Sequence, residues 1–312
     1  MPASEATFDP LAPYPAVVST AAALNGHDWP SFRAQFINLD WISRTLALRG
    51  ATPSPELEQF LERMVAENPD DVLAPTALAE VLIDAGWKIR SGYRASHVSD
   101  DQFRQFHDHL RRAERLLVDV IARDPAMVAA WELRLKTARG LQLGQSEARR
   151  RYDQLSRHHP HHLLAQQQYL QEICPKWSGS FEKAHAFGRE CLTGSPEGSM
   201  SPVIVADNVI EHWFELDGSE AVTYAHSAAV KAELREAADR SVFHPSFQRM
   251  PGWVVGVSTF ACAFTLAEDL PAAAACFRAL GPYAHEWGWR YLKGGAEVAF
   301  ARSRKRALEE SA

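Results

Sequence analysis

The sequence predicts an all-α protein in which tetratricopeptide-like helix pairs with degenerate repeats stack into a short solenoid. Prolines recur at near-constant intervals, helical periodicity runs through most of the chain, and no segment alternates as a strand does. From Pro125 to Pro160 is 35 residues, from Pro160 to Pro196 is 36, and from Pro245 to Pro282 is 37. These intervals are close to the tetratricopeptide period of about 34 residues.

The helix before each proline carries residues of matching size at matching offsets, as expected where paired helices approach closely. Offsets of 4, 3 and 5 residues recur in three sets: Ala113, Leu117, Val120, Pro125; Ala148, Tyr152, Leu155, Pro160; and Ala184, Gly188, Cys191, Pro196. The third set lacks the bulky second member, so the repeat is degenerate. We expect Ala148, Tyr152 and Leu155 on one buried face, because residues three and four apart share a side of a helix.

Helix boundaries are also marked. Ser54, followed by Pro55 and Glu56, supplies an N-cap oxygen, a proline suited to the first turn and an acid near the positive helix end. Two pairs have the spacing of capping boxes, and three glycines are expected to end helices. The pairs are Ser99 with Gln102 and Asp217 with Glu220; the glycines are Gly140, Gly194 and Gly218.

One domain, residues 1–312, is expected. Its parts are an exposed leader (1–14), N-terminal helices (15–69), helix-pair repeats (70–282) and a C-terminal capping helix (283–312). The predicted helices are 15–24, 29–48, 55–67, 72–91, 100–123, 126–139, 145–157, 161–174, 180–192, 201–216, 219–240, 253–268, 271–281 and 284–307. The units that end at Pro125 and Pro245 are longer than the period, and insertions in solenoids often mark a binding surface.

Composition narrows the functional classes. A net charge of −6 and a pI near 6.1 give no general attraction to nucleic acid or anionic membranes. The uncharged run 250–267 contains glycines and hydroxyl residues, so we expect a buried helix there and no membrane span. The four cysteines form no CxxC pair and fall in apolar helical stretches, which favours buried thiols, a reducing compartment and a cytoplasmic location.

Four segments together carry a family resemblance: Ala85-Gly86-Trp87-Lys88-Ile89-Arg90-Ser91-Gly92, Val98-Ser99-Asp100-Asp101, Ala138-Arg139-Gly140-Leu141 and Pro175-Lys176-Trp177-Ser178-Gly179-Ser180. The chain resembles an uncharacterised bacterial family of tetratricopeptide-like proteins catalogued as a domain of unknown function, over most of residues 70–215. Family members tend to have glycine where Ser178 stands. The resemblance implies helical repeats and carries no catalytic residues.

Imidazoles crowd the segment His158-His159-Pro160-His161-His162, and they are good ligands for zinc, nickel or copper. Adjacent side chains point in different directions, however, and no cysteine or carboxylate array nearby completes a ligand shell. We therefore favour an exposed polar turn over a metal site, and no cofactor is expected.

The best candidate binding residues are two tryptophans in turns between helices. Trp87, with Arg90 and the following loop, combines residue types that anchor interfaces, and Trp177 lies in a corresponding turn. Packing between degenerate repeats is the alternative role. Glu211 and His212 could provide acid–base chemistry, but neighbours on a helix face about 100° apart and cannot share a substrate without another element.

The C-terminal segment pairs aromatic residues with a basic run, Arg302, Arg304, Lys305 and Arg306, which could contact nucleic acid. We favour a solvated capping helix, because solenoids need one. No GxSxG, GxGxxG, GxxxxGK[ST] or HExxH motif occurs. The sequence thus predicts a non-catalytic scaffold for a protein or peptide, with an enzyme or enzyme accessory subunit as the alternative; it leaves small-molecule binding open.

Overall fold

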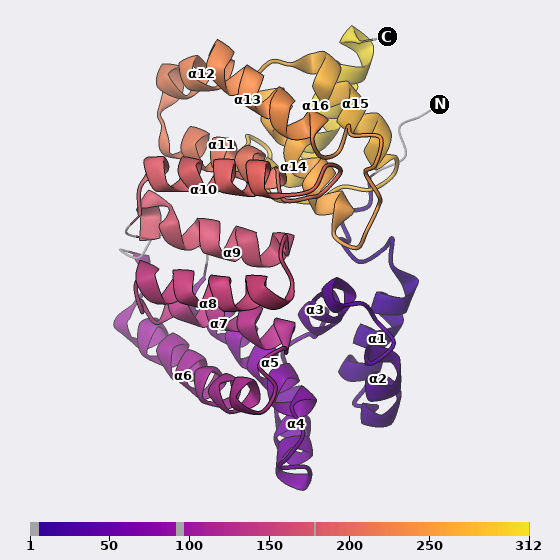
Figure 1. Cartoon of the computed structure of the whole chain (residues 1–312), viewed down its shortest axis with the longest axis vertical. Helices are drawn as coiled ribbons and strands as arrows, with labels where there is room; N and C mark the ends of the chain where they lie inside the picture. The colour runs from indigo at the N-terminus through magenta and orange to yellow at the C-terminus, as the bar shows by residue number, and fades with distance from the viewer. Residues whose placement is uncertain (1–5, 92–96, 178, 312) are drawn as a thin grey trace. The chain divides into compact units, whose positions relative to one another are not determined.

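The computed structural model describes residues 6–91, 97–177 and 179–311, and it confirms the all-α class. Helices account for 72% of the chain, and the described residues form no strand (Figure 1). The α-helices are α1 (Pro15–Asn25), α2 (Trp29–Phe36), α3 (Trp41–Arg49), α4 (Pro55–Glu67), α5 (Leu73–Arg90), α6 (Asp100–Arg123), α7 (Val128–Gly140), α8 (Gln145–His158), α9 (Leu163–Ile173), α10 (Phe181–Gly194), α11 (Val203–Glu215), α12 (Gly218–His226), α13 (Ala228–Asp239), α14 (Trp253–Leu266), α15 (Leu270–Leu280) and α16 (Gly295–Glu310).

The chain divides into two compact units. The N-terminal unit is Tyr14–Pro160, and the C-terminal unit combines Met1–Pro13 with His161–Ala312. In the N-terminal unit, α5 packs against α6, α6 against α7, and α7 against α8. The helices α3, α5 and α7 also touch one another, so these alternate helices form a continuous layer. Almost every residue of α7 is buried as a result.

The C-terminal unit repeats this mode of packing. Helix α10 packs against both α9 and α11, and α15 packs against both α14 and α16 (Figure 1). Helix α11 contacts α9 on one side and α14 on the other, and α12 and α13 also lie against it. The run 250–267 forms the buried helix α14, as predicted. None of the helices in the described ranges is long and apolar enough to cross a membrane.

Side-chain caps mark half of the helix starts. The Ser54 hydroxyl accepts the Leu57 N–H at 3.1 Å, and Ser99 with Gln102 forms the predicted capping box. The box predicted at Asp217 is wrong, because that side chain makes no capping hydrogen bond. Gly140 and Gly194 do end helices, whereas Gly218 begins α12.

Two predicted helices are each broken in two. Within 29–48, the Asp40 carboxylate accepts the backbone N–H groups of Ile42 and Ser43 at 3.0 Å each, and so starts α3 as a new helix. Within 219–240, Ser227 caps α13 in the same way. Neither break is at a proline. The helical spacing of apolar residues continues across both breaks, so periodicity alone predicts one helix at each place. Side-chain capping overrides the helical pattern at these positions.

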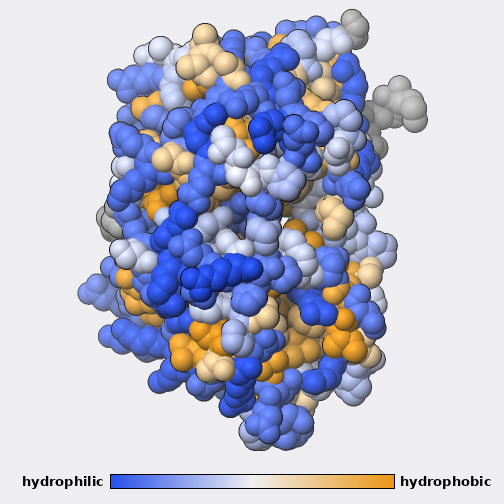
Figure 2. Space-filling model, in the orientation of Figure 1, coloured by the Kyte–Doolittle hydropathy of each residue, from blue (hydrophilic) through white to orange (hydrophobic). Residues whose placement is uncertain are grey.

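The buried face predicted for residues 148–155 is confirmed. Ala148 is 1% exposed, and Tyr152 and Leu155 are buried beside it on α8. All four cysteines are buried free thiols, as expected. Outside the core, most of the surface seen in Figure 2 is hydrophilic, and the exposed large apolar side chains are scattered over many helices.

Both ends of the C-terminal unit differ from expectation. The capping helix begins only at Gly295, and residues 281–294 form a non-helical segment with one 3₁₀ turn, Trp289–Tyr291. The expected exposed leader is partly attached to this segment. Thr7 donates to the Pro282 carbonyl at 2.7 Å, and Phe8 packs edge-on against Phe300.

Candidate binding face of helix α11

Helix α11 buries two carboxylates in an otherwise largely apolar setting. Asp207 and Glu211 are each 1% exposed, and their four-residue spacing places them on one side of the helix. Phe214 follows almost one turn later and is 38% exposed. We call these three residues the α11 face. Burying a carboxylate is costly unless hydrogen bonds or charges compensate it, so the partners of this face decide its properties.

Helix α9 supplies the first set of partners. Gln167 Nε2 donates to Asp207 Oδ2 at 2.9 Å, and Gln171 Nε2 donates to Glu211 Oε1 at 2.7 Å. The two glutamines are also four residues apart, so two matching amide–carboxylate pairs join α9 to α11. Both glutamines are half-buried.

Lys176 provides the only charge compensation seen on this face in the described residues. Its Nζ lies 2.6 Å from Glu211 Oε2, and it belongs to the 3₁₀ turn Pro175–Trp177. The turn is held where Ser180 N donates to the Ile173 carbonyl at 3.0 Å. Only glycine fits at Gly179, because a Cβ there would overlap that carbonyl.

The segment 281–294 covers Asp207 from another side. Trp287 Nε1 donates to Asp207 Oδ1 at 2.6 Å. The next residue, Gly288, has φ +78°, and a Cβ there would come within 2.9 Å of Cys262 Sγ, so the close approach requires glycine. The ring of Tyr291 lies 4.1 Å from that of Phe214 and 5.5 Å from that of Trp287. An aromatic border therefore adjoins the buried carboxylates.

The electrostatics of the two carboxylates differ. Among the described residues, Asp207 contacts no cation: its oxygens accept only from the neutral groups of Gln167 and Trp287. Burial, reinforced by the negative charge of Glu211, raises the pKa of Asp207 to about 7, although the two hydrogen bonds favour the ionised form. Burial likewise raises the pKa of the Cys262 thiol, with a further contribution from Asp207.

His212 does not join Glu211. Its ring stacks on Phe181 at 3.8 Å and lies 4.2 Å from Tyr224, whereas the Glu211 carboxylate is held by Gln171 and Lys176. Burial lowers the pKa of His212, and the charge of Glu182 only partly offsets this. The two neighbours thus face different elements. Trp177 is half-buried beside Lys176, at the edge of the α11 face.

Trp87 and Arg90 lie in the N-terminal unit. The Trp87 ring packs edge-on against Phe106 at 4.8 Å, with the guanidinium groups of Arg139 and Arg90 at 5.1 and 5.8 Å from its centroid. Arg90 is buried, which lowers its pKa, and it donates to the Ser91 carbonyl at 2.9 Å. These contacts favour the packing role for this pair. Residues 92–96 of the adjoining loop are outside the described residues.

The histidine cluster is less exposed than expected. His162 is buried and its Nδ1 accepts the Ala165 N–H at 3.3 Å, so it caps α9. His159 packs against Trp41 at 4.9 Å. Burial lowers the pKa of His159 and of His161. In the parts of the chain that the structure describes, no group of three or more His, Cys, Asp or Glu side chains is placed to hold a metal ion.

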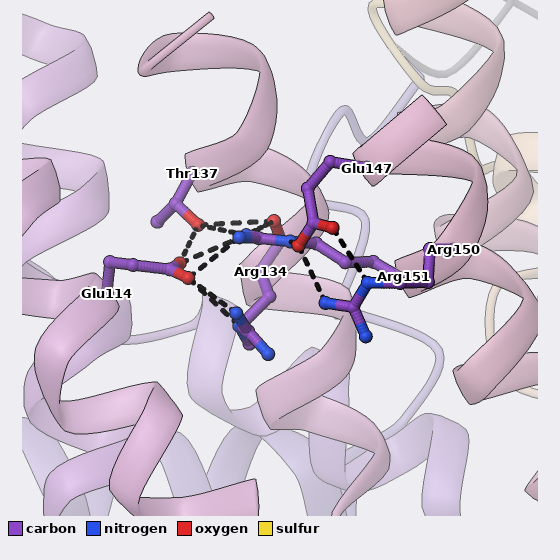
Figure 3. Close-up of polar contacts among 6 residues, drawn as sticks. All are labelled: Glu114, Arg134, Thr137, Glu147, Arg150 and Arg151. Atoms are coloured by element: carbon purple, nitrogen blue, oxygen red, sulfur yellow. Dashed lines mark hydrogen bonds and ion pairs between the residues drawn. The ribbon is translucent and has the colours of Figure 1, made fainter. Parts of the chain in front are cut away.

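A second set of buried charges lies in the N-terminal unit, where α6, α7 and α8 meet (Figure 3). Arg151 is 2% exposed, and its guanidinium donates to Glu114, Glu147, Thr137 Oγ1 and the Arg134 carbonyl. Glu114 also accepts from Arg134 Nη2 at 2.7 Å. We call this the Glu114 network: Glu114, Arg134, Thr137, Glu147, Arg150 and Arg151. Each of its two carboxylates is paired with two arginines, which suits a role in joining three helices.

The basic C-terminal run is also tied to the protein. Arg306 donates to both carboxylate oxygens of Glu268, at 2.8 and 2.7 Å, and to Glu310 at 3.0 Å. Helix α16 packs against α15 and α14. At least one cation of the run is therefore engaged within the chain.

Comparison with known proteins adds no family or relative. No protein-family model, no curated protein and no solved structure matches the chain. Of the α11 face and its partners, the sequence analysis singled out Glu211, the turn at Trp177 and the aromatic residues of the C-terminal segment, which include Trp287 and Tyr291. A usable signal for the others was present: Gln167 with Gln171, and Asp207 with Glu211, repeat at helical spacing. Nothing in the sequence pairs Trp287 with Asp207, which is 80 residues away.

Proposed function

We propose that the protein is a non-catalytic, tetratricopeptide-like scaffold that binds a peptide or protein segment at the α11 face. The packing of first helices against one another, α3–α5–α7 in one unit and α9–α11–α14 in the other, supports the repeat architecture. Stacked first helices commonly form the binding surface of such solenoids.

The observation that carries the proposal is the row of polar groups beside an aromatic border. Gln167 and Gln171 present half-buried amides that can both donate to and accept from a peptide backbone. Phe214, Trp287 and Tyr291 add aromatic surface, and Arg290 lies 5.0 Å from the Trp287 ring. Aromatic and arginine side chains that surround desolvated polar groups are the usual anchors of protein interfaces.

The proposal also accounts for Asp207. A buried carboxylate without a cation lowers stability at neutral pH, so its position needs a reason other than folding. A partner that donates hydrogen bonds beside Gln167 and Gln171 would interact favourably with the uncompensated charge of Asp207. Catalysis by Glu211 and His212 is less well supported, because their side chains have separate surroundings.

Selection of random 12-residue peptides, displayed on phage, against the full-length protein tests this proposal. We expect enriched peptides to bind Phe214→Ala or Lys176→Ala at least tenfold more weakly than the wild type. Val222→Ala is the matched control, since Val222 is an exposed apolar residue on α12 and is 50% exposed. Circular dichroism melts verify that each variant is folded.

Failure to enrich any peptide would contradict the proposal. So would enriched peptides whose affinity is unchanged in Phe214→Ala and Lys176→Ala, because they would bind elsewhere.

A further inference from the structure

A cavity of about 430 Å³ lies in the N-terminal unit between the first half of α4 and helices α5 and α6. Its volume falls within the range of roughly 300–1,000 Å³ typical of ligand pockets. Pro53, Pro55, Val81 and Ala85 provide apolar walls, while Glu58, Gln59, Glu62 and His109 provide polar groups. Apolar walls with a few convergent polar groups are the usual composition of a binding pocket.

The carboxylates of this cavity are only half neutralised. Arg112 Nη1 lies 2.7 Å from Glu58 Oε1, and Arg112 Nη2 lies 2.7 Å from Glu62 Oε1. One guanidinium therefore bridges two carboxylates, so the three groups together carry a net charge of −1. The second oxygen of each carboxylate is available to a ligand. The Glu58 and Glu62 side chains are 23% and 48% exposed, so a ligand from solvent can reach them.

Two further polar groups in the cavity are available to a ligand. Because a carbonyl can only accept, His109 Nδ1 donates to the Gln105 carbonyl at 2.8 Å, and Nε2 is the ring nitrogen left to a ligand. The Gln59 amide has no hydrogen-bond partner within the described ranges. The cavity thus offers mainly acceptors and a residual negative charge to its ligand.

We propose that this cavity binds a lysine side chain of a polypeptide partner. An ammonium group is a compact point charge with three donors, which matches two carboxylate oxygens and an imidazole nitrogen. The four-carbon stem would lie along the apolar walls, as lysine stems commonly do. This site is separate from the α11 face, so it does not depend on the function proposed above.

Ligand-observed saturation-transfer NMR with the full-length protein tests the proposal, with N-acetyl-lysine amide as the probe. We expect saturable binding that is at least tenfold weaker for N-acetyl-norleucine amide and for N-acetyl-(Nε-acetyl)lysine amide, which keep the stem and lack the charge. Glu58→Gln and Glu62→Gln should each weaken binding at least threefold. Glu67→Gln is the control, because Glu67 is an exposed acid on the same helix and does not line the cavity.

Equal binding of the lysine and norleucine probes would overturn the proposal, as would unchanged binding in both Glu58→Gln and Glu62→Gln. A tighter complex with pentane-1,5-diamine than with the lysine probe would show that the cavity is a site for free amines and not for polypeptide lysine. Val81→Leu, which reduces the volume of the cavity without changing its charge, should also weaken binding of the lysine probe.

Discussion

The Glu114 network and the α11 face both bury carboxylates, and they differ in what surrounds them. Glu114 accepts from two arginines and from Thr137, whereas Asp207 accepts only from a glutamine amide and an indole. The first arrangement pairs each carboxylate with arginines within three helices. The second leaves a charge that only protonation or a partner can compensate. Buried carboxylates are therefore paired with arginines in one region and lack a cation at Asp207 in the other, which is the difference on which the proposed binding surface rests.

The pKa values of the two regions shift in opposite directions. The hydrogen bond from Arg150, with support from Arg151, lowers the pKa of Glu147 to about 2. Burial raises that of Asp207 to about 7. The contribution of Glu147 to stability is present above its unfolded pKa, near 4.5, and is lost as the pH falls toward 2. Asp207 binds its proton more tightly when folded, so its contribution is present below about 3.8 and is lost as the pH rises through 7.

Removing Glu114 should give the largest effect. Glu114→Leu leaves Arg134 and Arg151 buried with fewer partners, and breaking a buried ion pair from one side typically costs about 3–5 kcal/mol. We expect a loss of that order in the stability of α6–α8, measured as faster hydrogen exchange in those helices. Asp119→Leu, at an exposed position of the same helix, should change exchange little.

Replacing Asp207 should raise the stability of the protein, unlike the loss of Glu114. Asp207→Asn keeps an acceptor for Trp287, and the Gln167 amide can rotate to accept from the new NH₂ group. At pH 8 we expect the variant to be more stable than the wild type by up to about 4 kcal/mol, because the cost of ionising a buried carboxylate is removed. Urea unfolding from pH 4 to pH 8 should show this gain shrinking toward zero at pH 4. A constant difference across that range would contradict the assigned cause.

The close approach of helices around α8 predicts a loss of stability on substitution that is smaller than the loss expected for Glu114→Leu. Ala148 is buried, and a larger side chain there would force neighbouring helices apart, at a typical cost of about 1–3 kcal/mol. Ala148→Leu should lower the melting temperature clearly. Arg157→Leu, at an exposed site on the same helix, should change stability by no more than about 0.5 kcal/mol. Equal effects would mean that the repeat register is wrong.

The acid response of Glu147 is expected to be the smallest of these effects, because its side chain is 27% exposed. Glu147→Gln should destabilise α8 at pH 7 and have little effect near pH 2, where the wild-type carboxylate is half protonated. Hydrogen exchange of α8 at both pH values, corrected for intrinsic rates, measures this difference. A penalty that is as large near pH 2 as at pH 7 would exclude the ion pair as its source.

Helical periodicity predicted most helices, but it missed two local caps and the contacts between distant elements. The spacing of Ala148, Tyr152 and Leu155 correctly indicated a buried helix face. Asp40 and Ser227 split two helices by capping, and helical periodicity does not record such breaks. In the α11 face, Glu211 could be singled out from its own segment of the sequence, whereas its partners Gln171 and Lys176 are 40 and 35 residues away. The helical spacing of Gln167 and Gln171 is visible in the sequence, but a single sequence does not indicate which distant residues they contact.

The hydrogen-exchange footprint of a selected peptide on the full-length protein tests the central claim most directly. If the α11 face is the binding surface, the peptide should slow exchange in α9, α11 and residues 281–294, and leave the Glu114 network in α6–α8 unchanged. Protection confined to α6–α8, or no protection in α9 and α11 at saturating peptide, would contradict the claim.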